Sequence, residues 1–399
     1  MSGPWTVDAG PLDDVSLLER LYACPELFER LKTLHGNELA IQKQLRAEYE
    51  DEVVRGALLL HDLRRRAPAK FSRGARMWFD RTGLEQATSE AVARHKAKRF
   101  AGQREVVDLC SGIGADSLAL AACSRVLAVD ARPAACLMAG WNAAVYEVEP
   151  QVHFQIGLAE EAGVEERSFH IDPDRRSGGQ RSMRIEDHRP GLEFLQQLSM
   201  HLSGGAIKLS PASNFGGKFP GCEIELISLA GECKEAVVWC GPLRTATDWR
   251  ATVLPAGESL IGDPWSAVSQ QAELGRYIYD PDPAVVRAGL VDVLCESAGL
   301  NRLDREEEYL TSSELVQTPF AQGFEVLAEL SNNDREIRNW FRKADCGQVE
   351  IKCRRIPVVP EKVRKQLPLG GSGALVLIFA RIGGRSRAVV GRRISTLNE

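Results

Sequence analysis

Residues 106–130 read VVDLCSGIGADSLALAACSRVLAVD, and this stretch decides the fold. Val106 and Val107 end a short apolar run that predicts a buried strand, and residues 125–129 predict a second one. Between them lie a tight turn at residues 108–116 and the start of a small apolar helix. This order predicts a strand–loop–helix–strand unit of an α/β sheet, whose ligand crevice lies outside the carboxyl ends of the strands.

The residue types of the loop indicate which ligand it can accept. Gly112 and Gly114 let the backbone approach a ligand that a Cβ would exclude. Asp108 and Asp116 stand at the two ends of the loop, where they would repel a pyrophosphate but attract a cationic sulfonium with an ammonium group. Asp130 ends the second strand, and its carboxylate can accept both hydroxyls of a ribose.

The string DLCSGIGAD at residues 108–116 resembles the first motif of class I S-adenosylmethionine (SAM) methyltransferases, and Asp130 matches their ribose-binding acid. The resemblance implies SAM as the cofactor. It also places the segment Leu158-Ala159-Glu160 where these enzymes meet the adenine. The cofactor-binding residues that we predict are Asp108, Cys110, Gly112, Gly114, Asp116, Asp130, Ala131, Ala159 and Asp172.

A second motif, DPDRR, begins at Asp172 directly after a predicted strand at residues 168–171. Amino-methylating enzymes of this class carry Asp/Asn-Pro-Pro-aromatic there, and the first side chain receives the hydrogens of the target amine. Asp172 and Pro173 match that pattern, whereas Asp174 and Arg175 depart from it, which disfavours an exocyclic amine as the target. A guanidinium can stack on a base and pair with phosphate, so a nucleic acid remains a consistent substrate. The predicted catalytic residues are Asp172, Pro173, Asp174 and Arg175.

The remaining strands of the sheet are predicted from the same kind of apolar run. Further strands are predicted at residues 152–156, 168–171 and 205–209, with a closing hairpin from residues 223–230 and 235–239. The fold class that we predict is therefore α/β, a Rossmann-like, mostly parallel sheet that closes on an antiparallel hairpin. A helix over residues 84–100 leads into the first strand. In its first turn, four polar residues either help to hold the methionine end of SAM or are merely exposed: Glu85, Gln86, Thr88 and Ser89.

A longer pattern extends the resemblance over roughly residues 70–399. The strings GLEQATSE, DLCSGIGAD, DPDRR, KLSPA, ECKEAVVW and YDPDPAVVRAGLV resemble a bacterial family of class I SAM-dependent methyltransferases with a C-terminal THUMP-like domain. The resemblance implies a methyltransferase acting on structured RNA, either tRNA or rRNA. Cysteine-catalysed C5 methylation is disfavoured, because neither DPDRR nor KLSPA contains a cysteine.

Four segments are expected along the chain. They are an N-terminal helical region (1–83), the methyltransferase domain (84–255), a connecting helical segment (256–304) and a basic THUMP-like α+β domain (305–399). The last of these contains a βαβαβ-like run.

Charge is distributed unevenly between these segments. The formal net charge is -5, yet residues 340–399 carry 13 Lys and Arg against 4 Asp and Glu. Such an asymmetry predicts a local anionic partner, and RNA would bind through this basic domain. The cations expected to contact it are Lys352, Arg354, Arg355, Lys362, Arg364, Lys365, Arg392 and Arg393.

Cysteine usage and hydropathy complete the expectations. Ten cysteines are scattered without a CxxC pair, which is typical of reduced thiols and predicts neither a disulfide framework nor a metal site. No run approaches the ~18 apolar residues of a membrane span, and three early acids, Asp8, Asp13 and Asp14, interrupt any signal-like region. We therefore expect a cytoplasmic protein without a membrane partner.

Three other functions remain open from the sequence. One is a nicotinamide-dependent oxidoreductase. Its fingerprint requires a third glycine near position 117, where this chain has Ser117, and its loop is less acidic than this one. A non-enzymatic RNA-binding protein could retain a SAM fold. A methyltransferase of a small molecule or protein could use the C-terminal domain only for packing.

Overall fold

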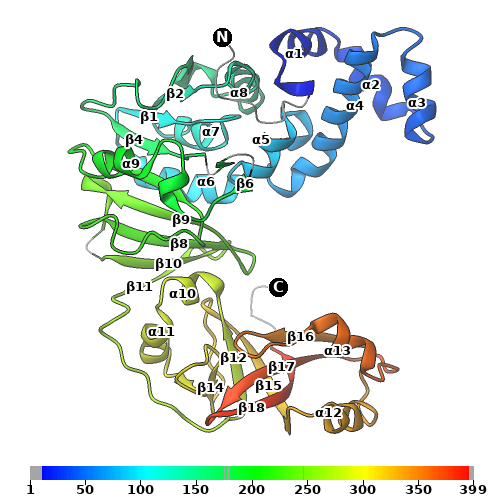
Figure 1. Cartoon of the computed structure of the whole chain (residues 1–399), viewed down its shortest axis with the longest axis vertical. Coiled ribbons are helices and arrows are strands. Elements are labelled where there is room, and N and C mark those ends of the chain that lie inside the picture. Colours follow the sequence, from blue (N-terminus) through cyan, green and yellow to red (C-terminus); the bar gives the residue numbers. More distant parts are fainter. Residues whose placement is uncertain (1–10, 175, 178–179, 246, 395–399) are drawn as a thin grey trace. The chain divides into compact units, whose positions relative to one another are not determined.

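The computed structural model describes residues 11–174, 176–177, 180–245 and 247–394 (Figure 1). The chain divides into two compact units. The first comprises residues 1–222 and 237–245, and the second comprises residues 223–236 and 246–399. The boundaries of the four segments expected from the sequence stay predictions. Within the described residues, no helix has the length and apolar character needed to cross a membrane.

A nine-stranded sheet has the strand order β11-β10-β8-β9-β7-β4-β1-β2-β3. Parallel pairing joins β1 to β2 and β4, β2 to β3, and β4 to β7. These strands agree with the predicted ones, and they are β1 (Glu105–Leu109), β2 (Arg125–Asp130), β3 (Val152–Ile156), β4 (Ser168–Ile171) and β7 (Gly205–Leu209). The predicted α/β class with a mostly parallel sheet is confirmed. Parallel strands end at one edge of the sheet, so this edge gathers the residues that follow β1, β2 and β4.

Crossover segments connect these parallel strands. The helices are α7 (Ala115–Ala121), α8 (Pro133–Tyr146) and α9 (Leu192–Ser199). A small antiparallel pair, β5 (Arg176–Ser177) and β6 (Gln180–Arg181), follows β4.

Six helices precede the sheet: α1 (Val15–Tyr22), α2 (Pro25–Thr33), α3 (Glu38–Leu45), α4 (Asp51–Arg66), α5 (Arg81–Gln86) and α6 (Glu90–Ala97). The helical structure breaks between α1 and α2 before Pro25, which takes the first position of α2 because its missing N–H is not needed there. Buried side chains of α1, α2 and α4 form one hydrophobic cluster with Ile113, Leu118 and Met138. The N-terminal helices are thus packed onto the layer that carries the glycine loop.

The helix predicted over residues 84–100 is wrong as a single element. The chain leaves α5 at Ala87, whose ψ of 138° is extended, and enters α6 only at Glu90. The Thr88 hydroxyl, which lies in this break, donates to Asp116 at 2.7 Å. A tertiary hydrogen bond therefore overrides the helical periodicity of the segment.

The predicted hairpin is confirmed, but it does not close the sheet, because β10 and β11 extend the sheet beyond it. Strands β8 (Glu223–Leu229) and β9 (Glu232–Cys240) are neighbours in the sheet, and the two residues between them, Ala230 and Gly231, have φ values of 52° and 78°. Two successive positive φ angles are typical of a tight two-residue hairpin turn. The segment predicted as a connection at residues 255–264 contains β11 (Glu258–Gly262), which pairs with β10 (Trp249–Leu254) in an antiparallel register.

A seven-stranded sheet forms the rest of the second unit, in the order β13-β14-β12-β15-β18-β17-β16. Its strands are β12 (Tyr277–Pro281), β13 (Asn301–Arg302), β14 (Leu310–Ser312), β15 (Ala321–Ser331), β16 (Gln348–Cys353), β17 (Ala374–Ile382) and β18 (Arg385–Arg393). Its helices are α10 (Pro283–Arg287), α11 (Val291–Ala298), α12 (Asp334–Phe341) and α13 (Pro360–Gln366). Residues 256–304 thus contain strands as well as helices.

The predicted βαβαβ run is observed as β15-α12-β16-α13-β17. Strand β18 was not predicted, because arginines flank its buried centre at residues 388–390 and obscure the apolar pattern. It inserts between β15 and β17 in antiparallel pairing with both. Buried side chains of α12 and the sheet form one core, against which Val363 of α13 packs, and the strands β12, β15, β17 and β18 contribute to a second.

Candidate functional site

The loop between β1 and α7 has an unusual backbone conformation. Cys110, Gly112 and Gly114 have φ values of 57°, 55° and 86°, in the left-handed region. A Cβ at position 114 would lie 3.2 Å from the Cβ of Ala139, so the helix α8 leaves little room for one. At position 112, by contrast, a Cβ would meet nothing within 4 Å. The loop is therefore closed on the side of α8 and open at Gly112.

Asp130, at the end of β2, ties this loop to the next one. One carboxylate oxygen accepts the N–H of Gly112 at 2.7 Å, and the other accepts the N–H of Arg132 at 2.9 Å. Burial raises the pKa of Asp130 above its ordinary value, although the guanidinium of Arg132 opposes that rise. Each oxygen retains a second lone pair, so the carboxylate can still accept two hydroxyls.

Asp108 is among the most deeply buried acids in the site. It is 1% exposed, accepts a hydrogen bond from the Ser117 hydroxyl, and lies 2.7 Å from Nδ1 of His170. The Nε2 atom of the same ring lies 3.4 Å from the ammonium of Lys96. Because an ammonium only donates, the network assigns an acceptor at Nε2 and a proton at Nδ1. Ser117 and His170 thus hold the Asp108 carboxylate in place at the base of the loop.

Asp116 is arranged differently. Its carboxylate lies 2.8 Å from the ammonium of Lys96 and accepts a hydrogen bond from the Thr88 hydroxyl at 2.7 Å. Burial alone would raise the pKa of Asp116, but the positive charge of Lys96 outweighs it and holds the pKa well below the usual range. The loop's second acid is therefore already neutralised by a cation of the chain.

Asp172 and Lys208 pair at the ends of β4 and β7. The Lys208 ammonium lies 2.5 Å from one carboxylate oxygen of Asp172, and the Asp172 N–H donates to the Leu109 carbonyl at 3.3 Å. The Lys208 side chain is 10% exposed and that of Asp172 is 32% exposed. Asp172 is therefore fixed by a cation behind it while part of its carboxylate faces open space.

Cys110 has no nucleophilic character here. Burial raises the pKa of its thiol well above the ordinary value, and the carboxylates of Asp130 and Asp172 raise it further. The thiol is protonated at neutral pH, whereas the thiolate is the nucleophile.

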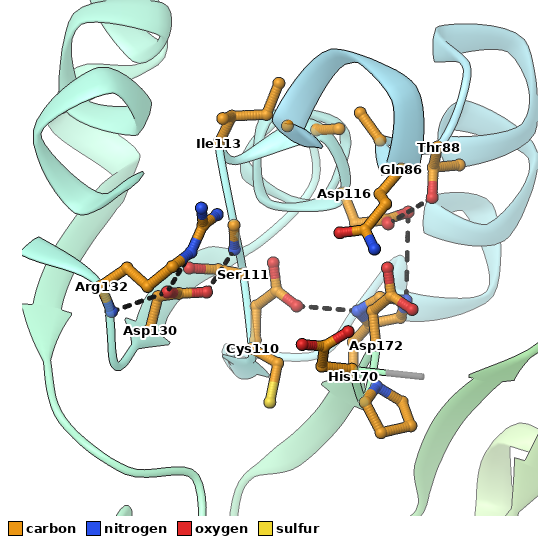
Figure 2. A pocket seen from close by; sticks show the side chains of 17 residues that line it. Gln86, Thr88, Cys110, Ser111, Ile113, Asp116, Asp130, Arg132, His170 and Asp172 are labelled. Atoms are coloured by element: carbon orange, nitrogen blue, oxygen red, sulfur yellow. Dashed lines mark hydrogen bonds and ion pairs between the residues drawn. The ribbon is translucent and has the colours of Figure 1, made fainter. Parts of the chain in front are cut away.

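One cavity joins these groups (Figure 2). Asp130 and Arg132 lie at one end of it, and Asp116, Thr88, His170 and Asp172 lie at the other. Its lining consists of Gly83, Gln86, Ala87, Thr88, Asp108, Cys110, Ser111, Gly112, Ile113, Ala115, Asp116, Asp130, Arg132, His170, Asp172, Pro173 and Asp174.

Most of the residues predicted from the sequence meet in this cavity. Three predicted cofactor residues do not line the cavity. Gly114 lies against α8, Ala131 is exposed, and Ala159 is buried. Arg175, predicted to be catalytic, lies outside the described residues. Of the four polar candidates before the first strand, Gln86 and Thr88 line the cavity, whereas Glu85 and Ser89 are not among the lining residues.

Sequence reasoning missed His170, Lys96 and Arg132. His170 is the third residue of the strand SFHI, and a polar residue inside an otherwise apolar strand was the available signal. Lys96 stands in a run of basic residues at the end of the predicted helix, where cations favour the helix dipole and are usually exposed. Its burial follows from the position of α7 against α6, which the local sequence does not encode.

Known proteins resemble this chain in sequence and in structure. The family model described as "THUMP domain-like" matches residues 321–393. An uncharacterized S-adenosylmethionine-dependent methyltransferase of Mycobacterium tuberculosis, found in strains CDC 1551 and H37Rv, is 36% identical over 337 residues, which are 81% of this chain and 92% of the relative. A crystal structure from Porphyromonas gingivalis W83, described as a methyltransferase, superposes with a TM-score of 0.72 at 18% identity, covering 91% of this chain and 100% of that one.

The sheet order, the glycine loop and the acid at the end of β2 define a class I SAM-dependent methyltransferase with a THUMP-like domain. By its identity to the mycobacterial relative, the chain belongs to the same family of SAM-dependent methyltransferases. Its cofactor is S-adenosylmethionine. The residues present fit that cofactor, because Gly112 leaves space for a ligand and Asp108 offers a negative charge to an ammonium or sulfonium.

Proposed function

We propose that this methyltransferase transfers a methyl group from SAM to a nucleotide of structured RNA. The observation that carries the proposal is the single cavity that brings the glycine loop together with Asp172, Pro173 and Asp174. A site that holds a methyl donor beside a fixed acceptor-binding group can align the two reactants.

At the cofactor end, Asp130 accepts the ribose hydroxyls and Asp108 faces the cationic methionine end. Asp116 has another part in this proposal, since Lys96 already occupies it: together with Thr88 it fixes the shape of the loop. Bound SAM supplies an electrophilic methyl group, so the chain's own residues need only position the acceptor and exclude water.

At the acceptor end, Asp172 accepts a hydrogen bond from the attacking group through the oxygen that does not face Lys208. The Lys208 ammonium fixes the position of the Asp172 carboxylate, so we assign Asp172 the role of orienting the acceptor. Cys110, with its raised pKa, takes no covalent part.

RNA contact is assigned to the second unit, through its exposed cations. Some of the cations predicted for this purpose face acids of the same unit: Lys352 and Arg354 pair with Asp280 at 2.9 and 2.7 Å, and Arg355 pairs with Glu308. Other exposed cations have no carboxylate partner in the described part of the chain, namely Arg335, Lys343, Lys362, Lys365, Arg385 and Arg392. These are free to neutralise phosphates.

The test is methyl transfer from methyl-labelled SAM to RNA from cells that lack the gene, followed by mass spectrometry of the nucleosides. We expect one modified nucleoside to appear with the wild-type protein and not with Asp172→Ala. Transfer of label to protein or small molecules but not to RNA would overturn the RNA substrate and leave the methyltransferase assignment intact.

A further inference from the structure

A lysine from the N-terminal region holds one wall of the cavity. The Lys70 ammonium donates to the carbonyls of Leu84, Glu85 and Ala87 at 2.8, 2.9 and 3.1 Å. Helix α5 ends at Gln86, so these carbonyls belong to its last turn and to the residue that follows. The last carbonyls of a helix have no partner within it, and a cation there interacts favourably with the helix dipole.

Residues 70–72 also bind the chain after residues 86–89, at the start of α6. The N–H and hydroxyl of Ser72 donate to the carboxylate of Glu90, the first residue of α6, at 2.6 and 3.0 Å. The Glu90 N–H donates to the Lys70 carbonyl at 2.9 Å, and the Tyr146 hydroxyl also donates to Glu90 at 2.9 Å. Residues 70–72 therefore hold the chain both before and after residues 86–89.

Three residues of the segment 86–89 line the cavity, namely Gln86, Ala87 and Thr88. Gln86 and Thr88 lie at the end occupied by Asp116 and Asp172, away from Asp130 (Figure 2). Helix α5 has only six residues, too few to be stable by its own hydrogen bonds. Its position therefore depends on contacts at its ends. At its start the Asp80 carboxylate accepts the Gly83 N–H and lies 2.9 Å from Arg132.

We propose that Lys70 is a positioning residue that holds residues 86–89 in the conformation that binds the methionine end of SAM. This inference rests on the proposed function, because it takes the part of the cavity beside Asp116, where Gln86 and Thr88 lie, as the site of the amino-acid part. It adds that the N-terminal region, which the sequence separates from the methyltransferase domain, completes the cofactor site.

The test compares two ligands on the full-length protein. Lys70→Met keeps most of the aliphatic stem and removes the ammonium. By calorimetry we expect it to weaken SAM and S-adenosylhomocysteine by tenfold or more. The affinity for 5′-methylthioadenosine, which lacks the amino-acid part, should stay within twofold. Lys70→Arg keeps a donor cation and should restore most of the SAM affinity.

The matched control is Arg64→Met. The Arg64 guanidinium also donates to backbone carbonyls, that of Met77 at 2.9 Å and that of Arg76, but this segment does not line the cavity. The control is expected to lower thermal stability while leaving SAM affinity within twofold. Hydrogen exchange of the wild type gives a readout that needs no variant: SAM should protect the amides of residues 87–89, and methylthioadenosine should not.

The outcomes separate this inference from the proposed function. An unchanged SAM affinity in Lys70→Met, an equal loss of SAM and methylthioadenosine, or no ligand-dependent protection at residues 87–89 would each overturn the role of Lys70. If the wild type binds SAM and Asp130→Ala weakens it, any such failure leaves the proposed function standing. If the wild type does not bind SAM, the proposed function fails first.

Discussion

The ammonium of Lys96 lies 2.8 Å from the carboxylate of Asp116, and the two side chains are only 2% and 9% exposed. The motif loop of this methyltransferase thus carries its own buried counter-ion, supplied by a helix that precedes the sheet. Breaking a buried ion pair by removing one partner leaves an uncompensated charge, whereas removing both partners can be nearly neutral.

The pair predicts the effect of Lys96→Met on stability. We expect this substitution to lower the free energy of unfolding by about 3–5 kcal/mol, because Asp116 stays buried without its cation. The double variant Lys96→Met with Asp116→Asn should recover most of that loss. Urea denaturation of the three proteins measures both effects. Equal losses in the single and double variants would show that the ion pair is not what Lys96 contributes.

The same pair predicts a pH dependence. The pKa of Asp116 is lower in the folded chain than its ordinary value of 3.8, so the stabilisation is fully present above that value. It is lost as the pH falls below it, through the folded pKa. The stability difference between wild type and the double variant should therefore be constant from pH 7 to about pH 5 and shrink below about pH 4. A difference that grows on acidification would contradict the assigned charges.

Asp172→Asn tests the acceptor end of the cavity. Under the proposed function Asp172 orients the acceptor, so SAM affinity should change by less than about threefold while turnover falls by about 100-fold. Calorimetry and the labelled transfer assay measure the two quantities. The matched control is Glu166→Gln, an exposed acid that does not line the cavity and should change neither. Equal turnover in Asp172→Asn and wild type would remove Asp172 from the proposed mechanism.

Charge reversal tests how RNA is held. Lys362 and Lys365 lie exposed on α13, without a carboxylate partner in the described part of the chain. Reversing both to Glu should weaken RNA binding and reduce its salt dependence, with SAM affinity unchanged. The control reverses Lys43 and Arg65, two exposed cations of the N-terminal helices. Filter binding across a salt series decides: an equal loss in both variants would indicate a non-specific effect of net charge.

Local pattern predicted the fold far better than it predicted the contacts of the site. The strands β3, β4 and β7 were predicted with their observed bounds, because short apolar runs between polar turns identify buried strands. Asp108 and Asp130 followed from the loop and strand order. Strand β18 was missed, since its arginines mask a short buried centre.

Contacts between segments that are distant in the sequence could not be predicted from the local sequence pattern. No sequence pattern indicated that Lys96 is buried against Asp116, and Lys352, which we predicted to contact RNA, lies 2.9 Å from Asp280. The break at residues 87–89 depends on a hydrogen bond to Asp116, 28 positions along the chain from Thr88. Such pairings are set by which elements the tertiary fold brings together, and the periodicity of a single segment carries no information about them.

The central claim is that the cavity between Asp130 and Asp172 is the SAM site, and calorimetric titration of SAM into wild type and Asp130→Ala tests it most directly. Loss of the ribose hydrogen bonds should cost about 1–3 kcal/mol, which is a weakening of roughly 5- to 150-fold, in a variant that remains folded. An unchanged SAM affinity in folded Asp130→Ala, or a wild-type protein that does not bind SAM, would contradict the account.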